Sequence, residues 1–253
     1  MKKMKTDYRT SHQNKEASRI YDEVLYKQGT YDDALWKEEQ RVLEHELVLL
    51  RNHAQTISLL DFATGTGRVL SFLESRVEYA TGVDIAEEML ERARQVVQKA
   101  KLVHADITRA DALGGETFDL ITAFRFFLNA EPALRNEAIA LLAQKLRDEE
   151  SVLIFNMHGN LWSHRVFTKF LLRLRGKHLS AATCREAIAL AERHGLQVVR
   201  WYGFGVLPKI IYRVIGSSFA RHLDGFFSSI PGARHISYDL VFVCKKKKAT
   251  GNI

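Results

Sequence analysis

The chain has 253 residues, of which 46% are hydrophobic and 26% charged, a balance typical of a globular protein and not of a disordered one. This length is enough for one full α/β domain or for two small domains. No N-terminal apolar run resembles a signal peptide, and no apolar stretch approaches the roughly 18 residues needed to span a bilayer, so we expect a cytoplasmic protein.

The net charge of +7 is unevenly distributed along the chain. Residues 1–150 carry −5 and residues 151–253 carry +12. A basic C-terminal portion can attract an anionic partner, although a solvated lysine run, Lys245–Lys248, with ordinary surface arginines is an equal alternative. Without that run and the three lysines among the first five residues, the net charge is zero. This argues against a dedicated nucleic-acid domain.

The hydrophobic periodicity divides the chain into an N-terminal lid and one large domain. Residues 1–34 are polar, with scattered tyrosines, and we expect a partly helical lid segment; residues 35–253 form the domain. Apolar residues then recur at helical spacing, and short apolar runs follow in alternation with amphipathic ones. The pattern predicts helices over 31–51, 67–76, 86–100 and 131–147, and strands over 56–63, 79–84, 101–106, 117–124 and 151–157. This alternation predicts right-handed βαβ units and a doubly wound, mostly parallel sheet.

Two insertions interrupt the alternation beyond residue 158, at about 158–180 and 205–235. The first contains a basic segment, 161–177, that we expect to be a helix. We expect the second to be helical as well, because compact domains rarely hold loops that long without structure. Both are predicted to form helical caps over the edge of the sheet. The remaining predicted elements are a helix over 183–195, opened by the capping-box pair Thr183 and Glu186, and strands over 196–204 and 236–244.

A glycine pair follows the first predicted strand in the stretch LLDFATGTGRVL. Gly65 and Gly67 permit a tight turn and a close approach of the backbone to a ligand, and a helix begins after them. Asp84 ends the next strand 19 residues after Gly65, the spacing at which a carboxylate can accept hydrogen bonds from both ribose hydroxyls of a nucleoside. The third glycine of the dinucleotide fingerprint is replaced by Leu70, so a pyrophosphate is less well accommodated.

Four motifs in order resemble those of one enzyme family. DFATGTGR resembles the D-x-x-x-G-x-G motif of class I S-adenosylmethionine-dependent methyltransferases, and GVDIAEEMLERAR resembles the acidic motif after their second strand. HADI and FDLITAFRFF resemble the motifs of their third and fourth strands. The resemblance covers about residues 35–157. It implies the seven-stranded, Rossmann-like methyltransferase fold, methyltransferase activity and S-adenosylmethionine as the cofactor.

The resemblance also implies a role for each motif. The first would hold the amino-acid end of the cofactor and the acid of the second would hold its ribose. Ile85 or Met89 would flank the adenine, and Asp106 would accept from its amino group. Arg125, beside Phe124 at the mouth of the fourth strand, would face the methyl sulfonium as a candidate catalytic residue. The carboxylates could instead cap loops, and Met89 could be a core residue. The implied cofactor-binding residues are Asp61, Ala63, Gly65, Gly67, Arg68, Asp84, Ile85, Met89, Asp106, Ile107 and Phe124.

A hydroxyl acceptor would have to lose a proton, so a base is expected near the carboxyl edge of the sheet. His158 ends the fifth predicted strand at that edge, and imidazole is the side chain that titrates nearest neutral pH. Its alternative role is that of a turn histidine. The candidate substrate contacts, each of which could instead be packing residues, are Tyr21 on the lid, Trp162 and His164.

We therefore expect a metal-independent O-methyltransferase for a small-molecule, sugar, glycan or glycolipid acceptor. The exit of the fourth strand, AFRFF, lacks the acids of a magnesium-dependent catechol-type site and the N/D-P-P-Y signature of base-amine methylation. N-methylation of an amino sugar or other amine, RNA methylation and a catalytically silent cofactor-binding protein remain alternatives. The basic, aromatic insertions suit an anionic acceptor, and residues 161–177 could instead rest on an anionic membrane. The oligomeric state is left open.

Overall fold

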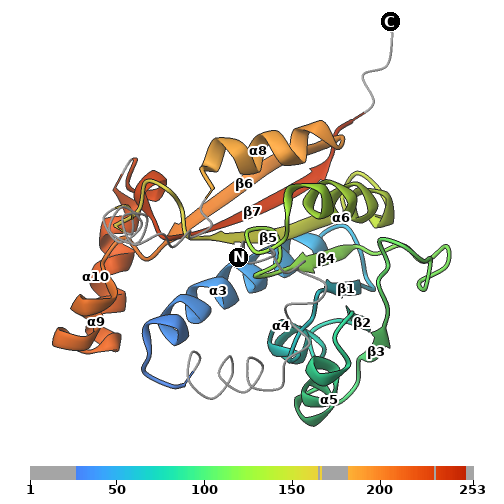
Figure 1. The fold of residues 1–253 in the computed structure, drawn as a ribbon, viewed down its shortest axis with the longest axis horizontal. Coiled ribbons are helices and arrows are strands. Elements are labelled where there is room, and N and C mark those ends of the chain that lie inside the picture. The colour runs from blue at the N-terminus through green and yellow to red at the C-terminus, as the bar shows by residue number, and fades with distance from the viewer. Residues whose placement is uncertain (1–26, 165, 167–181, 231, 249–253) are drawn as a thin grey trace, which may run out of the picture.

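The computed structural model describes residues 27–164, 166, 182–230 and 232–248, which build a seven-stranded sheet in the order β3-β2-β1-β4-β5-β7-β6 (Figure 1). Neighbours among the first five strands run parallel, and β7 runs antiparallel to both β5 and β6. The predicted doubly wound, mostly parallel sheet is therefore confirmed. The strands are β1 Ser58–Phe62, β2 Tyr79–Asp84, β3 Lys101–His104, β4 Leu120–Ala123, β5 Val152–His158, β6 Leu196–Phe204 and β7 Asp239–Lys246.

Helices cover both faces of the sheet, which explains why its central strands are continuously apolar. Figure 1 shows α6 and α8 over one face and α3, α4 and α5 over the other. Alternate strand residues supply two cores: Leu60 and Phe62 pack with α6 and α8, whereas Leu59 packs with α3 and α4. The helices are α3 Tyr31–Arg51, α4 Arg68–Leu73, α5 Glu87–Val96, α6 Pro132–Lys145, α8 Cys184–Arg193, α9 Lys209–Ile215, α10 Ser217–Ser229 and the 3-10 helix η2 Ala233–Ile236.

Helix α5 ends four residues before the predicted residue 100. The carboxylate of Glu74 explains this early end, because it accepts hydrogen bonds from the backbone N–H groups of Gln98, Lys99 and Ala100 at 2.8, 2.7 and 2.8 Å. These three amides are thereby held in the turn that leads into β3. Glu74 and α5 are far apart in sequence, so helical periodicity alone could not reveal the stop.

Helix α3 has the bounds predicted from the sequence, and the Thr30 hydroxyl at its N-cap accepts from the backbone N–H of Asp33 at 3.1 Å. The limit placed between the lid and the domain, at residues 34 and 35, falls within this helix. A strand boundary also differs from the prediction. The last strand begins at Asp239 and not at residue 236, because Ala233–Ile236 form η2. The predicted capping box of α8 is present: Thr183 and Glu186 each accept a hydrogen bond from the other's backbone.

The second insertion is helical, as predicted, and consists of α9, α10 and η2. Most of the helix predicted over 161–177 lies outside the described residues, as does the lid expected before residue 27. No helix in the described ranges has the length and apolar character needed to cross a membrane.

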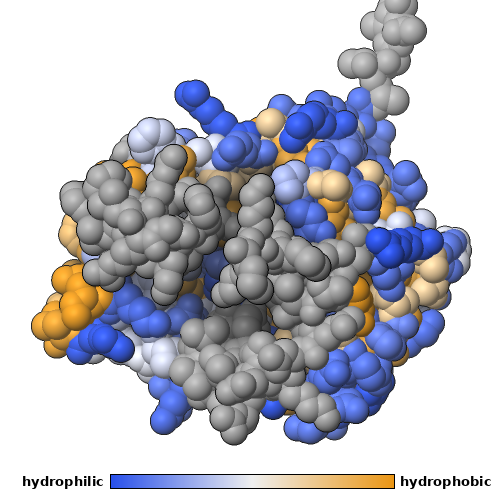
Figure 2. All heavy atoms as spheres, viewed as in Figure 1, coloured by the Kyte–Doolittle hydropathy of each residue, from blue (hydrophilic) through white to orange (hydrophobic). Residues whose placement is uncertain are grey.

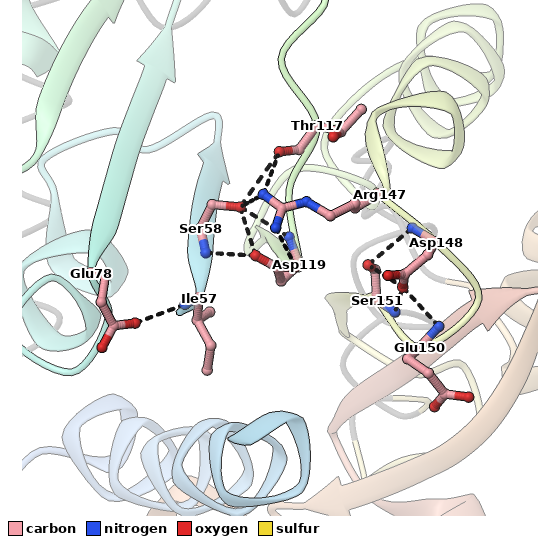
Figure 3. Close-up of polar contacts among 9 residues, drawn as sticks. All are labelled: Ile57, Ser58, Glu78, Thr117, Asp119, Arg147, Asp148, Glu150 and Ser151. Carbon is pink, nitrogen blue, oxygen red and sulfur yellow. Dashed lines mark hydrogen bonds and ion pairs between the residues drawn. The ribbon is translucent and has the colours of Figure 1, made fainter. Parts of the chain in front are cut away.

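Acidic side chains at the amino ends of the strands brace the sheet (Figure 3). The Asp119 carboxylate accepts from the backbone N–H and the hydroxyl of Ser58 at 2.7 and 2.8 Å, and Nη1 of Arg147 lies 3.1 Å from it. Glu78 likewise accepts from the backbone N–H of Ile57 at 2.7 Å. These carboxylates fix the starts of strands, so the acids at the carboxyl ends remain as candidates for chemistry.

Candidate functional site

The loop between β1 and α4 has an unusual backbone conformation. Ala63, Gly65 and Gly67 have φ of 55°, 56° and 84°, so three of five successive residues lie in the left-handed region. Ala63 and Arg125 are the only non-glycine residues with positive φ in the described ranges, and both line the same cavity. Such conformations cost about 1–2 kcal/mol each for a non-glycine residue, and they concentrate at functional sites.

That cavity opens at the carboxyl ends of β1, β2 and β4 and has an empty volume of about 660 Å³. A second cavity of about 330 Å³ adjoins it, because Ala63 and Asp84 line both. The first is lined by Asp61, Ala63, Thr64, Gly65, Thr66, Arg68, Val69, Asp84, Met89, Phe124, Arg125 and Asn129. The second is lined by Phe62, Ala63, Val83, Asp84, Ile85, Ala105, Asp106, Ile107, Thr108, Phe126 and Leu134.

Asp84 connects the second strand to the glycine loop. Its Oδ2 accepts from the backbone N–H of Gly65 at 2.7 Å, and its Oδ1 accepts from that of Ala86 at 2.9 Å. A carboxylate has about four acceptor positions, so these bonds are compatible with further bonds to two ribose hydroxyls. Asp84 lines both cavities, and its binding of a ribose stays a prediction.

Asp61 is a buried carboxylate at the floor of the first cavity. Its two oxygens accept from the hydroxyls of Thr64 and Thr122, each at 2.6 Å. Burial raises the pKa of Asp61 to about 6, and it does so against the two hydroxyl bonds, which lower the pKa. The group therefore titrates close to neutral pH and is sensitive to any charge placed beside it.

Gly67 has a packing position and lines neither cavity. A Cβ atom on it would lie 2.9 Å from Cγ2 of Val97 and 3.1 Å from Cβ of Ala93, so the glycine allows α4 to approach α5. Beside Gly65, in contrast, the nearest atom to such a Cβ is the carbonyl oxygen of Ala63 at 4.0 Å. The two glycines thus have different functions: one permits packing, and one leaves the cavity open.

The residues predicted to surround an adenine are divided between the cavities. Met89 lines the first, whereas Ile85, Asp106 and Ile107 line the second. Asp106 is oriented by Thr108, whose backbone N–H donates to its Oδ1 at 3.1 Å. The structure therefore brings Asp106 and Ile107 to the same place as Ile85, and Met89 to the side that faces the glycine loop.

A cluster of buried charges lies behind the first cavity. Glu39 of α3 is fully buried; its Oε2 lies 3.0 Å from Nη1 of Arg68, and its Oε1 accepts from Nδ2 of Asn156 at 2.9 Å. Arg125 completes the cluster, with Nη2 3.6 Å from Oε1 of Glu39 and 3.9 Å from Oδ2 of Asp239. We call these five residues the buried charge cluster.

The two acids of this cluster differ in protonation. Burial opposes ionisation of Glu39, but the guanidinium groups of Arg68 and Arg125 hold its pKa below the usual value. Burial raises the pKa of Asp239 well above its usual value, and the charge of Glu39 raises it further. The two arginines thus favour the ionised form of Glu39, whereas burial and the neighbouring charge of Glu39 disfavour the ionised form of Asp239.

Arg125 was expected to face the methyl sulfonium, but its guanidinium lies in the buried charge cluster. Arg125 also lines the first cavity, so its role beside the methyl sulfonium stays a prediction. Its backbone is fixed by two hydrogen bonds: the N–H donates to Oδ1 of Asn156 at 2.6 Å, and the carbonyl accepts from Asn129 at 2.6 Å. Arg68 is similar, since its guanidinium lies 4.1 Å from the ring centre of Trp36. Both arginines thus line the first cavity and tie its wall to the buried carboxylates.

His158 ends β5 at the carboxyl edge, opposite Asp239 in the β5–β7 register. The sheet register aligns Asp61 of β1 with Thr122 of β4, and Thr122 with Ile154 of β5. His158 stands four residues after Ile154, so it lies on the same face of the sheet as Asp61 and about 13 Å further along the strand direction. It is partly buried and lines neither cavity. Its position suits an acceptor bound beside the first cavity.

The other candidate substrate contacts are dispersed. Trp162 is 67% exposed and beyond the cavity lining, whereas the ring of His164 lies 5.8 Å from that of Tyr238. Tyr21 is outside the described residues, as are the lysines and arginines of the first insertion, which are Arg165, Lys169, Arg173, Arg175 and Lys177.

Several residues of the site were missed from sequence. Thr64, Thr66, Val69, Thr122, Asn129, Glu39, Asn156 and Asp239 line the first cavity or bond to its walls. A signal existed for Glu39, because it stands four residues after Leu35 and four before Leu43, on the apolar face of α3. A charged residue at such a position is buried only when it is paired.

Within the described part of the chain, no group of three or more His, Cys, Asp or Glu side chains is arranged to hold a metal ion. Residues 59–149 match a family model described as a methyltransferase domain. Among curated proteins, none matches this sequence.

Three solved structures share the fold. The magnesium protoporphyrin IX methyltransferase (ChlM) from Synechocystis PCC 6803, with bound SAH, is 13% identical; the match covers 95% of this chain and 100% of that one, with a TM-score of 0.64. An S-adenosylmethionine-dependent methyltransferase from Clostridium acetobutylicum ATCC 824 is 14% identical over 92% of this chain and 98% of that one, with a TM-score of 0.61. The N-methyltransferase NodS from Bradyrhizobium japonicum WM9 is 14% identical; the match covers 93% of this chain and 97% of that one, with a TM-score of 0.60. At these identities the likeness shows the fold.

Proposed function

We propose that the chain, whose residues 59–149 match a methyltransferase domain model, is an S-adenosylmethionine-dependent methyltransferase and that it methylates a hydroxyl group of a small-molecule, sugar or glycan acceptor without a metal ion. The position of His158 is the observation that favours a hydroxyl acceptor over an amine acceptor. It ends β5 on the face of the sheet that also bears Asp61.

The residues of the two cavities fit the cofactor. The open space beside Gly65 accommodates a ligand against the backbone, and the buried carboxylate of Asp61 suits the ammonium group of a methionine moiety. Asp84 would accept from the ribose, and Asp106 with Ile107 would hold the adenine in the second cavity. When bound, S-adenosylmethionine supplies a methyl group activated by a positively charged sulfur.

The chain's own residues would then align the acceptor and remove its proton. Alignment of two reactants can supply about 7–11 kcal/mol of the barrier reduction. A positioned base adds about 10²–10⁴-fold for an acceptor that must lose a proton, and an imidazole is suited to this at neutral pH. His158 would accept the hydroxyl proton, and Asp239, paired opposite it, lies in the buried charge cluster. A neutral amine acceptor would need no such base.

The test is transfer of a labelled methyl group from S-adenosylmethionine to a panel of hydroxyl and amine compounds, with mass spectrometry of each product. We expect methyl ether products, and activity that is unchanged by a metal chelator. Methylation of amines alone would contradict the O-methyltransferase proposal. Loss of activity with chelator that magnesium restores would contradict its metal independence.

A further inference from the structure

Exposed apolar side chains gather on the second insertion. Eight of the thirteen large apolar side chains that are exposed in the described ranges belong to residues 210–236. Figure 2 shows them as an orange area at the left, over α9 and α10. We call the outward-facing part of this set the α9–α10 face. It comprises Ile210, Val214, Phe219, Phe226 and Ile230.

The spacing of these residues places them on the outer sides of both helices. Ile210 and Val214 are four residues apart on α9, at 58% and 72% exposure. Phe219 and Phe226 are seven residues apart on α10, at 59% and 66% exposure. Surface helices normally turn the apolar stripe toward the core. Here, the inner side of α10 instead carries Ala220 and Asp224, both buried, and the apolar stripe faces away from the domain.

Polar and aromatic contacts hold this pair of helices in place from the inner side. The Asp224 carboxylate accepts from the backbone N–H groups of Gly205 and Leu207 at 2.8 and 2.6 Å. The Tyr212 ring packs edge-on against that of Tyr31, with ring centres 4.8 Å apart. These contacts fix the inner sides of α9 and α10 to the domain, and the apolar face therefore points outward in a defined orientation.

The exposed charges of residues 205–236 are all positive. Residues 205–236 contain four Lys or Arg and one acid, Asp224, which is buried. No carboxylate is therefore exposed on this segment. Arg213 is exposed beside Val214, and Lys209 precedes Ile210. Two of the four cations pair with carboxylates of α3, Lys209 with Asp32 and Arg221 with Glu38, each at 3.3 Å. The exposed guanidinium of Arg213 stands directly beside the apolar stripe, an arrangement that complements a surface that is apolar inside and anionic at its rim.

We infer that the α9–α10 face docks on the surface of an anionic lipid membrane. Its apolar side chains would enter the boundary between headgroups and acyl chains, and the guanidinium of Arg213 would reach the lipid phosphates. Because β6 ends at Phe204, level with Asp239 and His158, docking would bring the carboxyl edge of the sheet toward the membrane. The inference does not depend on methyl transfer.

The test is co-sedimentation of the full chain with phosphatidylcholine vesicles, with and without phosphatidylglycerol. We expect binding that requires phosphatidylglycerol and weakens with salt. The double variant Phe219→Ser/Phe226→Ser should bind about tenfold or more weakly, and so should Arg213→Glu. The matched control is Val48→Ser/Val96→Ser, which removes exposed apolar side chains from α3 and α5. It should bind as the wild type does. Circular dichroism melting verifies that each variant is folded.

Absence of binding to both kinds of vesicle by the folded wild type would overturn the inference. Equal binding by the folded double variant would overturn it as well. Light scattering of the wild type tests whether a second copy of the chain covers the face instead. A dimer that the double variant abolishes, together with no binding to vesicles, would assign the face to that second copy and contradict the membrane proposal.

Discussion

The carboxylate of Glu39 lies 3.0 Å from the guanidinium of Arg68, and both groups are almost wholly buried. This ion pair joins α3, which precedes the matched methyltransferase region, to the first residue of α4. The wall of the first cavity thus depends on a helix outside the region that carries the family motifs.

Replacement of Glu39 by alanine should therefore destabilise the protein by about 3–5 kcal/mol, because it leaves two buried guanidinium groups without their carboxylate. The free energy of unfolding, measured by denaturant titration, checks this. Glu44→Ala is the matched control, since Glu44 pairs with Arg76 at the surface and should cost at most about 1 kcal/mol. Equal effects of the two variants would show that the buried pair has no special importance.

Asp61 should make cofactor affinity depend on pH. Burial raises its pKa to about 6, so below that pH the carboxyl group is mostly protonated and cannot pair with the ammonium group of the cofactor. Affinity should rise as pH increases through 6, and binding near pH 6 should release a proton. Calorimetry in buffers of different ionisation enthalpy measures both quantities. In Asp61→Asn the affinity should be weaker at high pH and the proton release absent; an unchanged pH profile would remove Asp61 from this role.

Gly67→Ala should destabilise the fold more than an alanine at an open glycine. Gly67 has φ of 84° and a new Cβ would lie 2.9 Å from Val97, whereas Gly114 has φ of 56° and nothing within 4 Å. We expect a loss of about 2–4 kcal/mol for Gly67→Ala, from backbone strain and overpacking together, and about 1–2 kcal/mol for Gly114→Ala. Thermal and denaturant unfolding give the comparison. Similar losses would mean that α5 can move aside.

His158→Ala should lower kcat for a hydroxyl acceptor by about 10²-fold or more, with little change in cofactor affinity, because a base acts on the reaction and not on cofactor binding. His53→Ala, at an exposed histidine outside the site, is the control. A change of less than about threefold would assign His158 to the turn instead of to proton transfer.

The part of the site that could be predicted from sequence is the part built from local motifs. Asp61, Gly65 and Asp84 each end a strand or follow one, and parallel neighbouring strands bring such residues to one edge. Phe124 directly follows β4 and lines the same cavity, as does Met89 in the first turn of α5. The alternation of strands and helices, with the family resemblance, also predicted the doubly wound, mostly parallel seven-stranded sheet, although not the order of its strands.

The buried charge cluster could not be predicted in the same way. Asn156 and Asp239 stand in apolar strand sequences 83 residues apart, and Nδ2 of Asn156 reaches Oδ1 of Asp239 at 3.2 Å only through the antiparallel insertion of β7 beside β5. The polar residues that interrupt apolar runs were visible. Their partners were not, because pairing across the sheet depends on register.

The central measurement is calorimetric binding of S-adenosylhomocysteine to the wild type, to Asp84→Ala and to the exposed control Asp111→Ala. The wild type and the control should bind alike. Asp84→Ala, folded by circular dichroism, should bind about 100-fold more weakly or not measurably, since it loses two charge-assisted hydrogen bonds to the ribose. Unchanged affinity in the folded variant, or no binding by the wild type, would contradict the conclusion that the glycine loop and the carboxylate at the end of β2 together hold the cofactor.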